Sequence, residues 1–372
     1  MPLSGQTGLE KFRRITSGGN YIPEIDGLRF LAIFWVAVWM HLPTMMNEHL
    51  FNGTLLANTY VASVVREGGH GVSFFFMISG FILALPFIKE KVQGAATVSL
   101  KKYYVRRLTR LEPPYLAALL LAFCALIFFN GASFSEQLPH LGASAVYIHN
   151  IAYNSASSVL GVAWSLEVEV QFYLLAPFLC FIFLIKQTLL RRCLLALLIV
   201  ASALYAWDSL WQHPVILPNF ICYFLSGMLL ADLYASEHKS KLNSSIGLFT
   251  GILILAALPF LISLNSVWLF LAKQLLMFLV FYLVLFNERL KKPMSIQWIT
   301  IIGGMCYSIY LLHVLIMSVV ARGLDSISSI GGVEGVIVYG IILLGAVLFF
   351  SAIFYRLIEQ PCMRRDWWKR KK

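Results

Sequence analysis

The sequence has few charged residues for its length. Asp, Glu, Lys and Arg together make up 13% of its 372 residues, whereas hydrophobic residues make up 59%. A chain with so little charge would expose a large apolar surface in water, which excludes a water-soluble globular protein. Acidic residues are fewer than basic residues, and the formal net charge is +11. The basic residues form short clusters between apolar runs, which indicates orientation at an anionic membrane surface and argues against nucleic acid as a partner.

Patterned cysteines and a removable leader peptide are also missing. The six cysteines have neither the spacing of a metal site nor that of a disulfide framework, and five of them lie inside apolar runs. We therefore expect buried, unreactive thiols and neither a bound metal nor a bound cofactor. The first apolar run follows a polar, basic segment and lacks a small-residue cleavage pattern, so we expect the first membrane span to remain in the mature protein.

What the sequence has in abundance is apolar runs of membrane-spanning length. They predict an all-α, polytopic integral membrane protein with about ten transmembrane helices. Short, weakly polar loops within 168–208 and 246–286 leave the division into spans open there. The runs lie near 28–46, 72–88, 113–130, 168–186, 193–208, 217–235, 246–264, 267–286, 300–321 and 336–357.

The distribution of basic residues predicts the orientation. With ten spans and the N-terminus inside, 24 of the 29 Lys and Arg residues fall in cytoplasmic segments, as the positive-inside rule requires. We expect a multi-pass membrane protein with both termini in the cytoplasm. Its expected organisation is a cytoplasmic segment over 1–22, a transmembrane domain over 23–361 and a basic tail over 362–372.

Ionisable residues inside a span are costly, so each is a candidate for function. Asp26 and Arg29 begin the first span, and His41 lies roughly 18 Å further along a helix, in its outer half. A lone histidine near the end of a span more often packs at the interface, so His41 needs a partner. Glu169, near the outer start of the fourth span, is the candidate. A structural role for Glu169 as a hydrogen-bond acceptor is an equally good interpretation.

Three arginines precede the third span. Arg106 and Arg107 lie four and three residues before Arg110, so a helix would bring their side chains near that of Arg110. Guanidinium groups clustered in this way suit phosphates. Ordinary positive-inside charge explains the cluster as well.

The later spans raise the same question at four positions. His313 is a further histidine inside an apolar run. Arg356 and Glu359 are three residues apart and are expected to neutralise each other. Lys273 has no partner nearby in the sequence, and we expect its ammonium group to extend to the membrane surface.

Seven segments, in order between Glu24 and Pro361, resemble the membrane-bound acyltransferase family 3. Each segment is weak evidence alone, whereas their fixed order is specific. The resemblance implies ten core helices, a cytoplasmic N-terminus and O-acylation of surface polysaccharides, antibiotics or other acceptors. The segments are IDGLRFLAIFWVAVWMH, GVSFFFMISGFILA, YYVRRLTRLEPPY, VAWSLEVEVQFYLLAP, YFLSGMLLA, YSIYLLH and LIEQP.

The resemblance also implies roles for individual residues. It makes His41 the catalytic base and Glu169 a second essential acidic group, with Arg29 as the basic partner of His41. Arg107 and Arg110 correspond to the family's arginine motif. The implied donor is acyl-coenzyme A, most commonly acetyl-coenzyme A, whose phosphates fit an arginine cluster by charge-assisted hydrogen bonds.

The chain departs from the family pattern in the first span. Eleven residues separate Arg29 from His41, whereas the family has ten. Twelve α-helical steps leave the two side chains about 120° apart, so either a π-bulge restores the register or they face different parts of the bundle. Ser73 also stands where relatives often have Asp. Some relatives carry an extracytoplasmic esterase-like domain after the membrane part, so we expect this chain to act alone or with a separate extracytoplasmic partner.

The combined expectation is a membrane O-acyltransferase. Acyl-coenzyme A would dock by its phosphates at Arg107 and Arg110, and its thioester would reach His41 and Glu169. His41 would then deprotonate a hydroxyl of a surface polysaccharide, glycolipid or other acceptor, unless it is itself transiently acylated. The acceptor site is expected in outer loops 47–71 and 131–163, which carry the four histidines His49, His70, His140 and His149.

Two other functions remain open. A transporter or flippase would also contain buried ionisable residues, although the inverted repeats with broken helices typical of many transporters are not found. A non-catalytic scaffold that keeps the fold is the second, and the altered spacing in the first span favours it.

Overall fold

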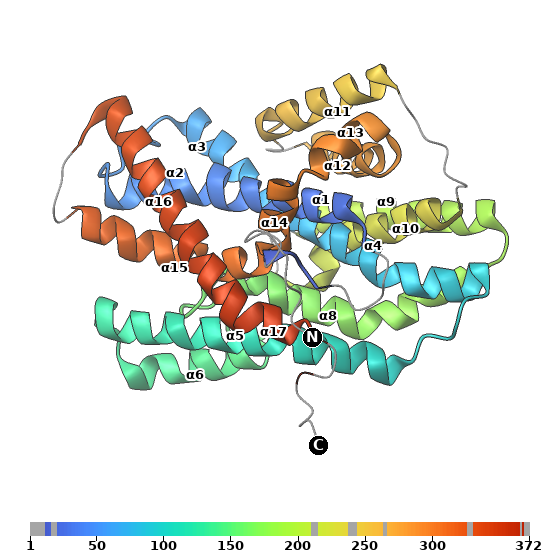
Figure 1. Cartoon of the computed structure of the whole chain (residues 1–372), viewed down its shortest axis with the longest axis horizontal. Coiled ribbons are helices and arrows are strands. Elements are labelled where there is room, and N and C mark those ends of the chain that lie inside the picture. The colour runs from blue at the N-terminus through green and yellow to red at the C-terminus, as the bar shows by residue number, and fades with distance from the viewer. Residues whose placement is uncertain are drawn as a thin grey trace, which may run out of the picture. The chain divides into compact units, whose positions relative to one another are not determined.

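The computed structural model describes residues 12–15, 21–209, 215–236, 244–262, 266–325, 330–364 and 367 (Figure 1). These residues form helices, without a β-strand in the ranges given. Most of the expected cytoplasmic segment 1–22, the basic pair Lys239 and Lys241, and all of the tail beyond Arg364 except Trp367 lie outside the described residues.

The helices confirm an all-α, polytopic membrane protein. Eight helical segments are long and apolar enough to cross a membrane, and two shorter apolar segments, Ile221–Ser236 and Ser245–Phe260, coincide with the remaining two predicted runs. The run predicted over 300–321 is broken at Met305, where one helix ends and the next begins. The eight segments are Pro23–His49, Thr59–Gln93, Leu100–Asn130, Gly161–Leu184, Thr188–Ser209, Val267–Phe286, Cys306–Asp325 and Gly332–Cys362.

The chain divides into two compact units, and each is described by itself. The first unit comprises residues 1–71, 108–118 and 292–372, and the second comprises 72–107 and 119–291. Helix α5 contributes its ends to the second unit and its middle to the first.

In the first unit, α15 packs against α16, and α1 packs against α14. The helix formed by α1, η2 and α2 is continuous and also contacts α15. Two of its elements, η2 and η8, are π-helices. The elements are α1 (Pro23–Ile33), η2 (Phe34–His41), α2 (Leu42–His49), α3 (Thr59–Arg66), η3 (Glu67–Gly69), α14 (Gln297–Gly304), α15 (Cys306–Asp325), α16 (Gly332–Phe354), η8 (Tyr355–Glu359) and α17 (Gln360–Cys362).

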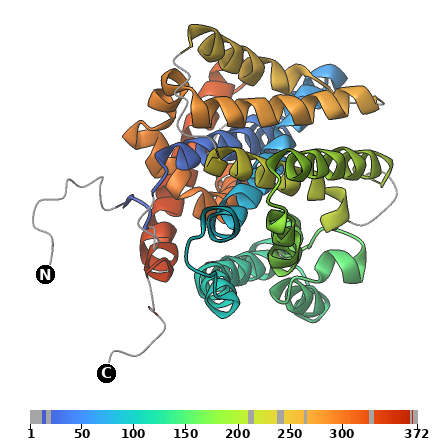
Figure 2. The same ribbon diagram turned by 90° about the vertical axis from the view of Figure 1, so that its right-hand side faces the viewer.

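In the second unit, α9 packs along α10, and α12 contacts both (Figures 1 and 2). The elements are α4 (His70–Gln93), α5 (Leu100–Asn130), α6 (Phe134–Ala145), α7 (His149–Tyr153), η4 (Gly161–Ala163), α8 (Trp164–Leu179), η5 (Cys180–Leu184), α9 (Thr188–Ser209), η6 (Leu217–Asn219), α10 (Ile221–Ser236), α11 (Ser245–Ala257), η7 (Leu258–Phe260), α12 (Val267–Phe286) and α13 (Glu288–Met294).

Glycines and stacked aromatic rings fix α4, α8 and α10 around one another. A Cβ atom at Gly80 would overlap the carbonyl oxygen of Phe224, and one at Gly227 would overlap that of Met77. Small residues at such crossings let membrane helices approach closely. The ring of Phe224 also stacks on that of Phe172 of α8, with 4.0 Å between centroids. This packing sets the position of α8 relative to α4, which matters for the site below.

Candidate active site

The first membrane span contains a π-helix that ends at His41. Arg29 lies in α1, and η2 follows over Phe34–His41. A π-helical turn holds more residues than an α-helical turn because each hydrogen bond spans five residues, so η2 takes up the extra residue between Arg29 and His41. Of the two alternatives that the spacing left open, the structure contains the π-helix.

His41 contacts the neighbouring helix α15, whereas Arg29 contacts a residue of its own helix. Arg29 donates to Asp26 of α1 at 2.6 Å. His313 of α15 contacts His41.

His41 and His313 are joined by their ring nitrogens. The Nε2 atom of His313 lies 3.0 Å from the Nδ1 atom of His41, which also lies 3.0 Å from the carbonyl oxygen of Val36. The Nδ1 atom of His313 lies 3.0 Å and 2.8 Å from the carbonyl oxygens of Ile309 and Tyr310. Among the described residues, the remaining nitrogen, Nε2 of His41, has no hydrogen-bond partner. It is the ring nitrogen left available to exchange a proton.

Arg29 is part of a buried charged cluster at the start of the first span. Asp26, which is 1% exposed, pairs with Arg29 and with Arg14, whose Nη1 lies 3.2 Å away. Arg110 also interacts electrostatically with Asp26. Outside the span, burial and the neighbouring Asp26 carboxylate, which accepts a hydrogen bond from the hydroxyl of Tyr21, raise the pKa of Tyr21 to about 12. The structure therefore pairs Arg29 with Asp26, while His41 pairs with a second histidine.

Glu359 joins the same electrostatic cluster. Its carboxylate accepts hydrogen bonds from the backbone N–H and the hydroxyl of Ser308, and it interacts electrostatically with Arg110. Arg356 donates to the side-chain oxygen of Gln360. Arg110 thus interacts with two buried carboxylates of the first unit.

Glu169 has a separate setting in the second unit. Its carboxylate accepts hydrogen bonds from the hydroxyl of Ser79 on α4 and from that of Tyr173, one turn further along α8. Two hydroxyl donors fix the orientation of a carboxylate without neutralising its charge.

Arg107 packs against the ring of Tyr173. Its guanidinium carbon is 5.8 Å from the ring centroid of Tyr173 and 5.9 Å from that of Tyr103, and its Nε atom is buried with no hydrogen-bond partner among the residues that the structure describes. The hydroxyl of Tyr103 donates to the backbone oxygen of Tyr173 at 3.1 Å. Tyr173 therefore connects Arg107 to Glu169 within one unit.

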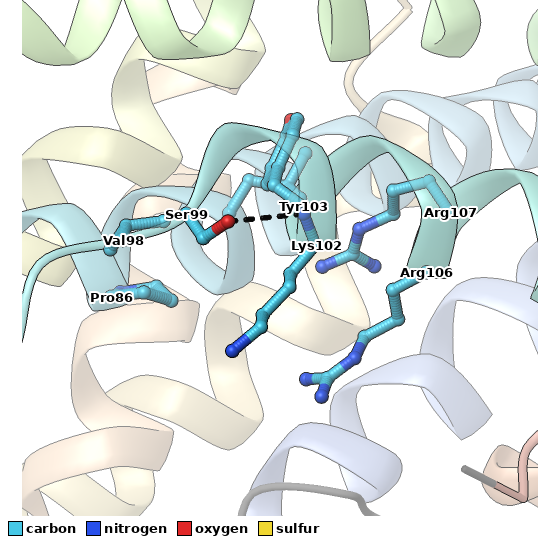
Figure 3. A pocket seen from close by; sticks show the side chains of 8 residues that line it. Pro86, Val98, Ser99, Lys102, Tyr103, Arg106 and Arg107 are labelled. Carbon is cyan, nitrogen blue, oxygen red and sulfur yellow. Dashed lines mark hydrogen bonds between the residues drawn. The ribbon is translucent and has the colours of Figure 1, made fainter. Parts of the chain in front are cut away.

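Arg107 also lines a basic pocket of about 230 Å³ beside the start of α5. Figure 3 shows the nitrogen-bearing ends of Lys102, Arg106 and Arg107 gathered on one side of α5. Ser99 caps the helix by accepting from the backbone N–H of Lys102 at 3.4 Å. The whole lining consists of Leu83, Pro86, Val98, Ser99, Lys102, Tyr103, Arg106 and Arg107.

The expected site residues are thus divided between the two units. His41, Arg29 and Arg110 belong to the first unit, whereas Glu169 and Arg107 belong to the second. The pairing of His41 with Glu169 stays a prediction, as does the joint use of Arg107 and Arg110.

Comparison with known proteins identifies the family. A family model described as an acyltransferase domain, of acyltransferase family 3, matches residues 22–356, which is most of the chain. The chain belongs to acyltransferase family 3.

The similar proteins include two O-acetyltransferases. The chain is 25% identical over 340 residues to the peptidoglycan O-acetyltransferase OatA of Listeria monocytogenes, covering 82% of this chain and 51% of that protein. It is 26% identical over 324 residues to the O-acetyltransferase OatA of Staphylococcus aureus, covering 79% and 50%. The chain thus spans about half the length of these relatives. No solved structure matches.

Sequence reasoning on this acyltransferase did not single out Lys102, and it noted Arg106 and His313 without assigning them to the site. Lys102 and Arg106 line the basic pocket instead of Arg110, and their spacing of four residues was the available signal for one helix face. His313 was noted as unusual, but its partner His41 lies 272 residues away, and nothing local in the sequence pairs them.

A pair of histidines joins α6 to α7. The Nδ1 atom of His140 lies 2.8 Å from the Nε2 atom of His149. The ring of His149 stacks on that of Tyr153, and the ring of His140 is tilted against it. Burial lowers the pKa of His149, and the neighbouring His140 adds to the shift, although a hydrogen bond to the backbone oxygen of Ser155 opposes it.

One expectation for the transmembrane helices is wrong. Lys273 does not extend to the membrane surface, because its side chain is 2% exposed and lies inside the second unit on α12. In the described ranges, no group of three or more His, Cys, Asp or Glu side chains has the geometry to hold a metal ion.

Proposed function

We propose that this chain is a membrane O-acyltransferase that moves an acyl group from acyl-coenzyme A to a hydroxyl group of a surface polysaccharide, glycolipid or related acceptor. The observation that carries the proposal is His41, whose Nδ1 atom is held by Val36 and His313 while Nε2 is left open. A histidine held in this way inside an acyltransferase domain has the form of a general base. Acetyl is the acyl group that the names of the relatives favour.

The donor is proposed to bind at the basic pocket. Lys102, Arg106 and Arg107 present three cations to one cavity, and coenzyme A carries three phosphates or phosphate esters that such cations bind by charge-assisted hydrogen bonds. Arg107 supports this, because it lines the same cavity while its guanidinium carbon lies over the rings of Tyr103 and Tyr173, which hold the group in place. With the proposed orientation, both termini and this pocket face the cytoplasm of a bacterial cell.

The reaction is a single acyl transfer. The acceptor hydroxyl gives its proton to Nε2 of His41 as its oxygen attacks the thioester carbonyl carbon. The carbon–sulfur bond then breaks, and the proton passes from His41 to the leaving thiolate, giving an ester and free coenzyme A. The proposed role of Glu169, oriented by Ser79 and Tyr173, is to stabilise the positive charge that develops during transfer.

The test is transfer of label from radiolabelled acetyl-coenzyme A to the saccharide fraction of membrane vesicles that contain the chain. His41→Ala is expected to lower the rate about a thousandfold at matched protein level, within the usual contribution of general bases. Thr44→Ala, three residues further along, removes a hydroxyl that donates only to the backbone oxygen of Met40, so it is the matched control and should keep the wild-type rate. Full transfer by His41→Ala would overturn the base assignment, and absence of transfer by the wild-type chain would favour a transporter or a scaffold.

A further inference from the structure

His313 is a histidine on α15 that is fully buried. We propose that His313 is a positioning residue for the reaction: its Nε2 atom accepts the Nδ1 hydrogen of His41 and so keeps the reactive lone pair on Nε2 of His41. The inference deepens the proposed function and rests on it.

The backbone fixes the proton on His313. Its Nδ1 atom lies within hydrogen-bond distance of two carbonyl oxygens, those of Ile309 and Tyr310, and a carbonyl oxygen only accepts. Nδ1 of His313 therefore carries the hydrogen. In the neutral ring the other nitrogen, Nε2, is then an acceptor.

The same logic fixes the proton on His41. Its Nδ1 atom faces the carbonyl oxygen of Val36 and the Nε2 atom of His313, each at 3.0 Å, and both are acceptors. Nδ1 of His41 must therefore be the donor, shared between them. The neutral ring then carries its lone pair on Nε2, the nitrogen that has no protein partner in the described part of the chain.

The π-helix takes part in this arrangement. Val36 lies five residues before His41, the span of one π-helical hydrogen bond, so its carbonyl oxygen lies beneath the ring of His41. A ring held on one edge by its own helix and by α15 has little freedom to turn over. His313 supplies the second of these two restraints.

The hydrogen bond from Nδ1 of His41 to Nε2 of His313 also stabilises the protonated form of His41. When Nε2 of His41 takes the hydroxyl proton, the ring becomes an imidazolium whose Nδ1 hydrogen still points at Nε2 of His313. The acceptor stabilises that charge, as a carboxylate does in other triads, but it places no negative charge inside the membrane span. The proton then leaves from Nε2 to the thiolate, and His313 is unchanged.

Kinetics with two substitutions test the role. His313→Ala removes the acceptor, whereas His313→Gln replaces it with an amide oxygen. For acetyl transfer from radiolabelled acetyl-coenzyme A in vesicles, we expect kcat to fall about a hundredfold in His313→Ala and at most about tenfold in His313→Gln, with KM for acetyl-coenzyme A unchanged. Leu312→Ala, the adjacent buried residue, is the packing control and should lower thermal stability with little change in kcat.

A double substitution separates positioning from a general structural role. If His313 acts through His41, His41→Ala combined with His313→Ala is no slower than His41→Ala alone. A further large loss in the double variant, or a kcat for His313→Ala equal to that of Leu312→Ala, would overturn the proposal.

A spectroscopic measurement tests the geometry without activity. Solid-state NMR of protein with labelled histidine nitrogens, compared with the spectrum of His41→Ala, should show His41 with hydrogen on Nδ1 in the wild type and a mixture of tautomers in His313→Ala. A hydrogen on Nε2 of His41 in the wild type would overturn the inference. Full activity of His41→Ala, by contrast, would overturn the proposed function while the NMR result still decided the hydrogen bond.

Discussion

Arg107 lies over one face of Tyr173, 5.8 Å from its ring centroid, while the hydroxyl of Tyr173 donates to the carboxylate of Glu169. One side chain therefore separates the basic pocket from the acidic residue of α8. The second unit connects Arg107 and Glu169 through this side chain, and we expect a donor bound at the pocket to extend its arm along Tyr173.

The basic pocket predicts how the donor is recognised. Lys102→Ala and Arg106→Ala are each expected to raise KM for acetyl-coenzyme A about tenfold, because each removes a charge-assisted contact, and to leave kcat unchanged. The measurement is the dependence of acetyl transfer on donor concentration, made at low ionic strength so that exposed charges are not screened.

Lys101→Ala is the matched control for that prediction. Lys101 precedes Lys102 on α5, has the same charge, and is not among the residues that line the pocket. Acetyl-dephospho-coenzyme A gives a second comparison, since it lacks the 3′-phosphate. Equal KM values for the intact and dephosphorylated donors, together with no effect of Lys102→Ala or Arg106→Ala, would remove the phosphate assignment.

The hydroxyl donors of Glu169 predict a graded series. Glu169→Gln keeps the shape but loses the charge, and we expect transfer to fall about a hundredfold or more. Tyr173→Phe keeps the ring beneath Arg107 but loses the hydrogen bond to Glu169, so a smaller loss of about tenfold is expected. Tyr104→Phe, which removes a hydroxyl bonded to the backbone oxygen of Leu174, is the control and should transfer at the wild-type rate. A Tyr173→Phe variant with full activity would leave Glu169 without the proposed orientation.

The sequence was sufficient for the spans because hydropathy is local. Every predicted apolar run corresponds to an apolar helical segment, and the errors concern boundaries, such as the break at Met305. The spacing between Arg29 and His41 also limited the answer to two alternatives, since helical geometry is periodic. The spacing could not choose between these alternatives. Whether the same residues form an α-helix or a π-helix depends mainly on their contacts with neighbouring helices.

The contacts of the site were beyond sequence reasoning. His313 approaches His41 across 272 residues, and Asp26 attracts Arg29 and Arg14 because all three are brought together in a buried cluster. The arginine motif offered three residues with equivalent chemistry. Only the course of α5 decides that Arg106 and Arg107 line a pocket whereas Arg110 interacts with Asp26 and Glu359.

The buried His149 predicts loss of stability in acid. Its pKa is lowered in the folded protein, so the unfolded chain binds more protons as the pH falls below about 6.5, and the free energy of unfolding decreases. His140, Tyr153 and the carboxylate of Glu167, which accepts from the backbone N–H of Asn150, are the titratable groups beside it among the described residues. The thermal midpoint of the purified protein should therefore be lower at pH 5.5 than at pH 7.5, two values that lie about one unit below and above 6.5.

His149→Gln should flatten that pH profile, since an amide does not titrate. His49→Gln, a histidine at the end of α2 outside this cluster, should keep the wild-type slope. An unchanged slope in His149→Gln would show that other groups control the acid sensitivity.

The π-helix η2 predicts that one residue of the first span is dispensable. Deleting Val38 leaves ten residues between Arg29 and His41, and the segment can then close as an α-helix in which Arg29 keeps Asp26 on its own helix and His41 still faces His313 of α15. Acetyl transfer should stay within about tenfold of the wild-type rate, because the ring of His41 keeps its contact with His313 but loses the π-helical position of the Val36 carbonyl. Deleting Leu311 is the matched control: it lies in the regular α-helix α15 between Ser308 and His313, so its removal turns His313 by about 100° from His41 and should abolish transfer. If the Val38 deletion is as inactive as the Leu311 deletion at equal membrane levels, η2 does more than accommodate an extra residue, and its π-helical hydrogen bonds are themselves required for the geometry of His41.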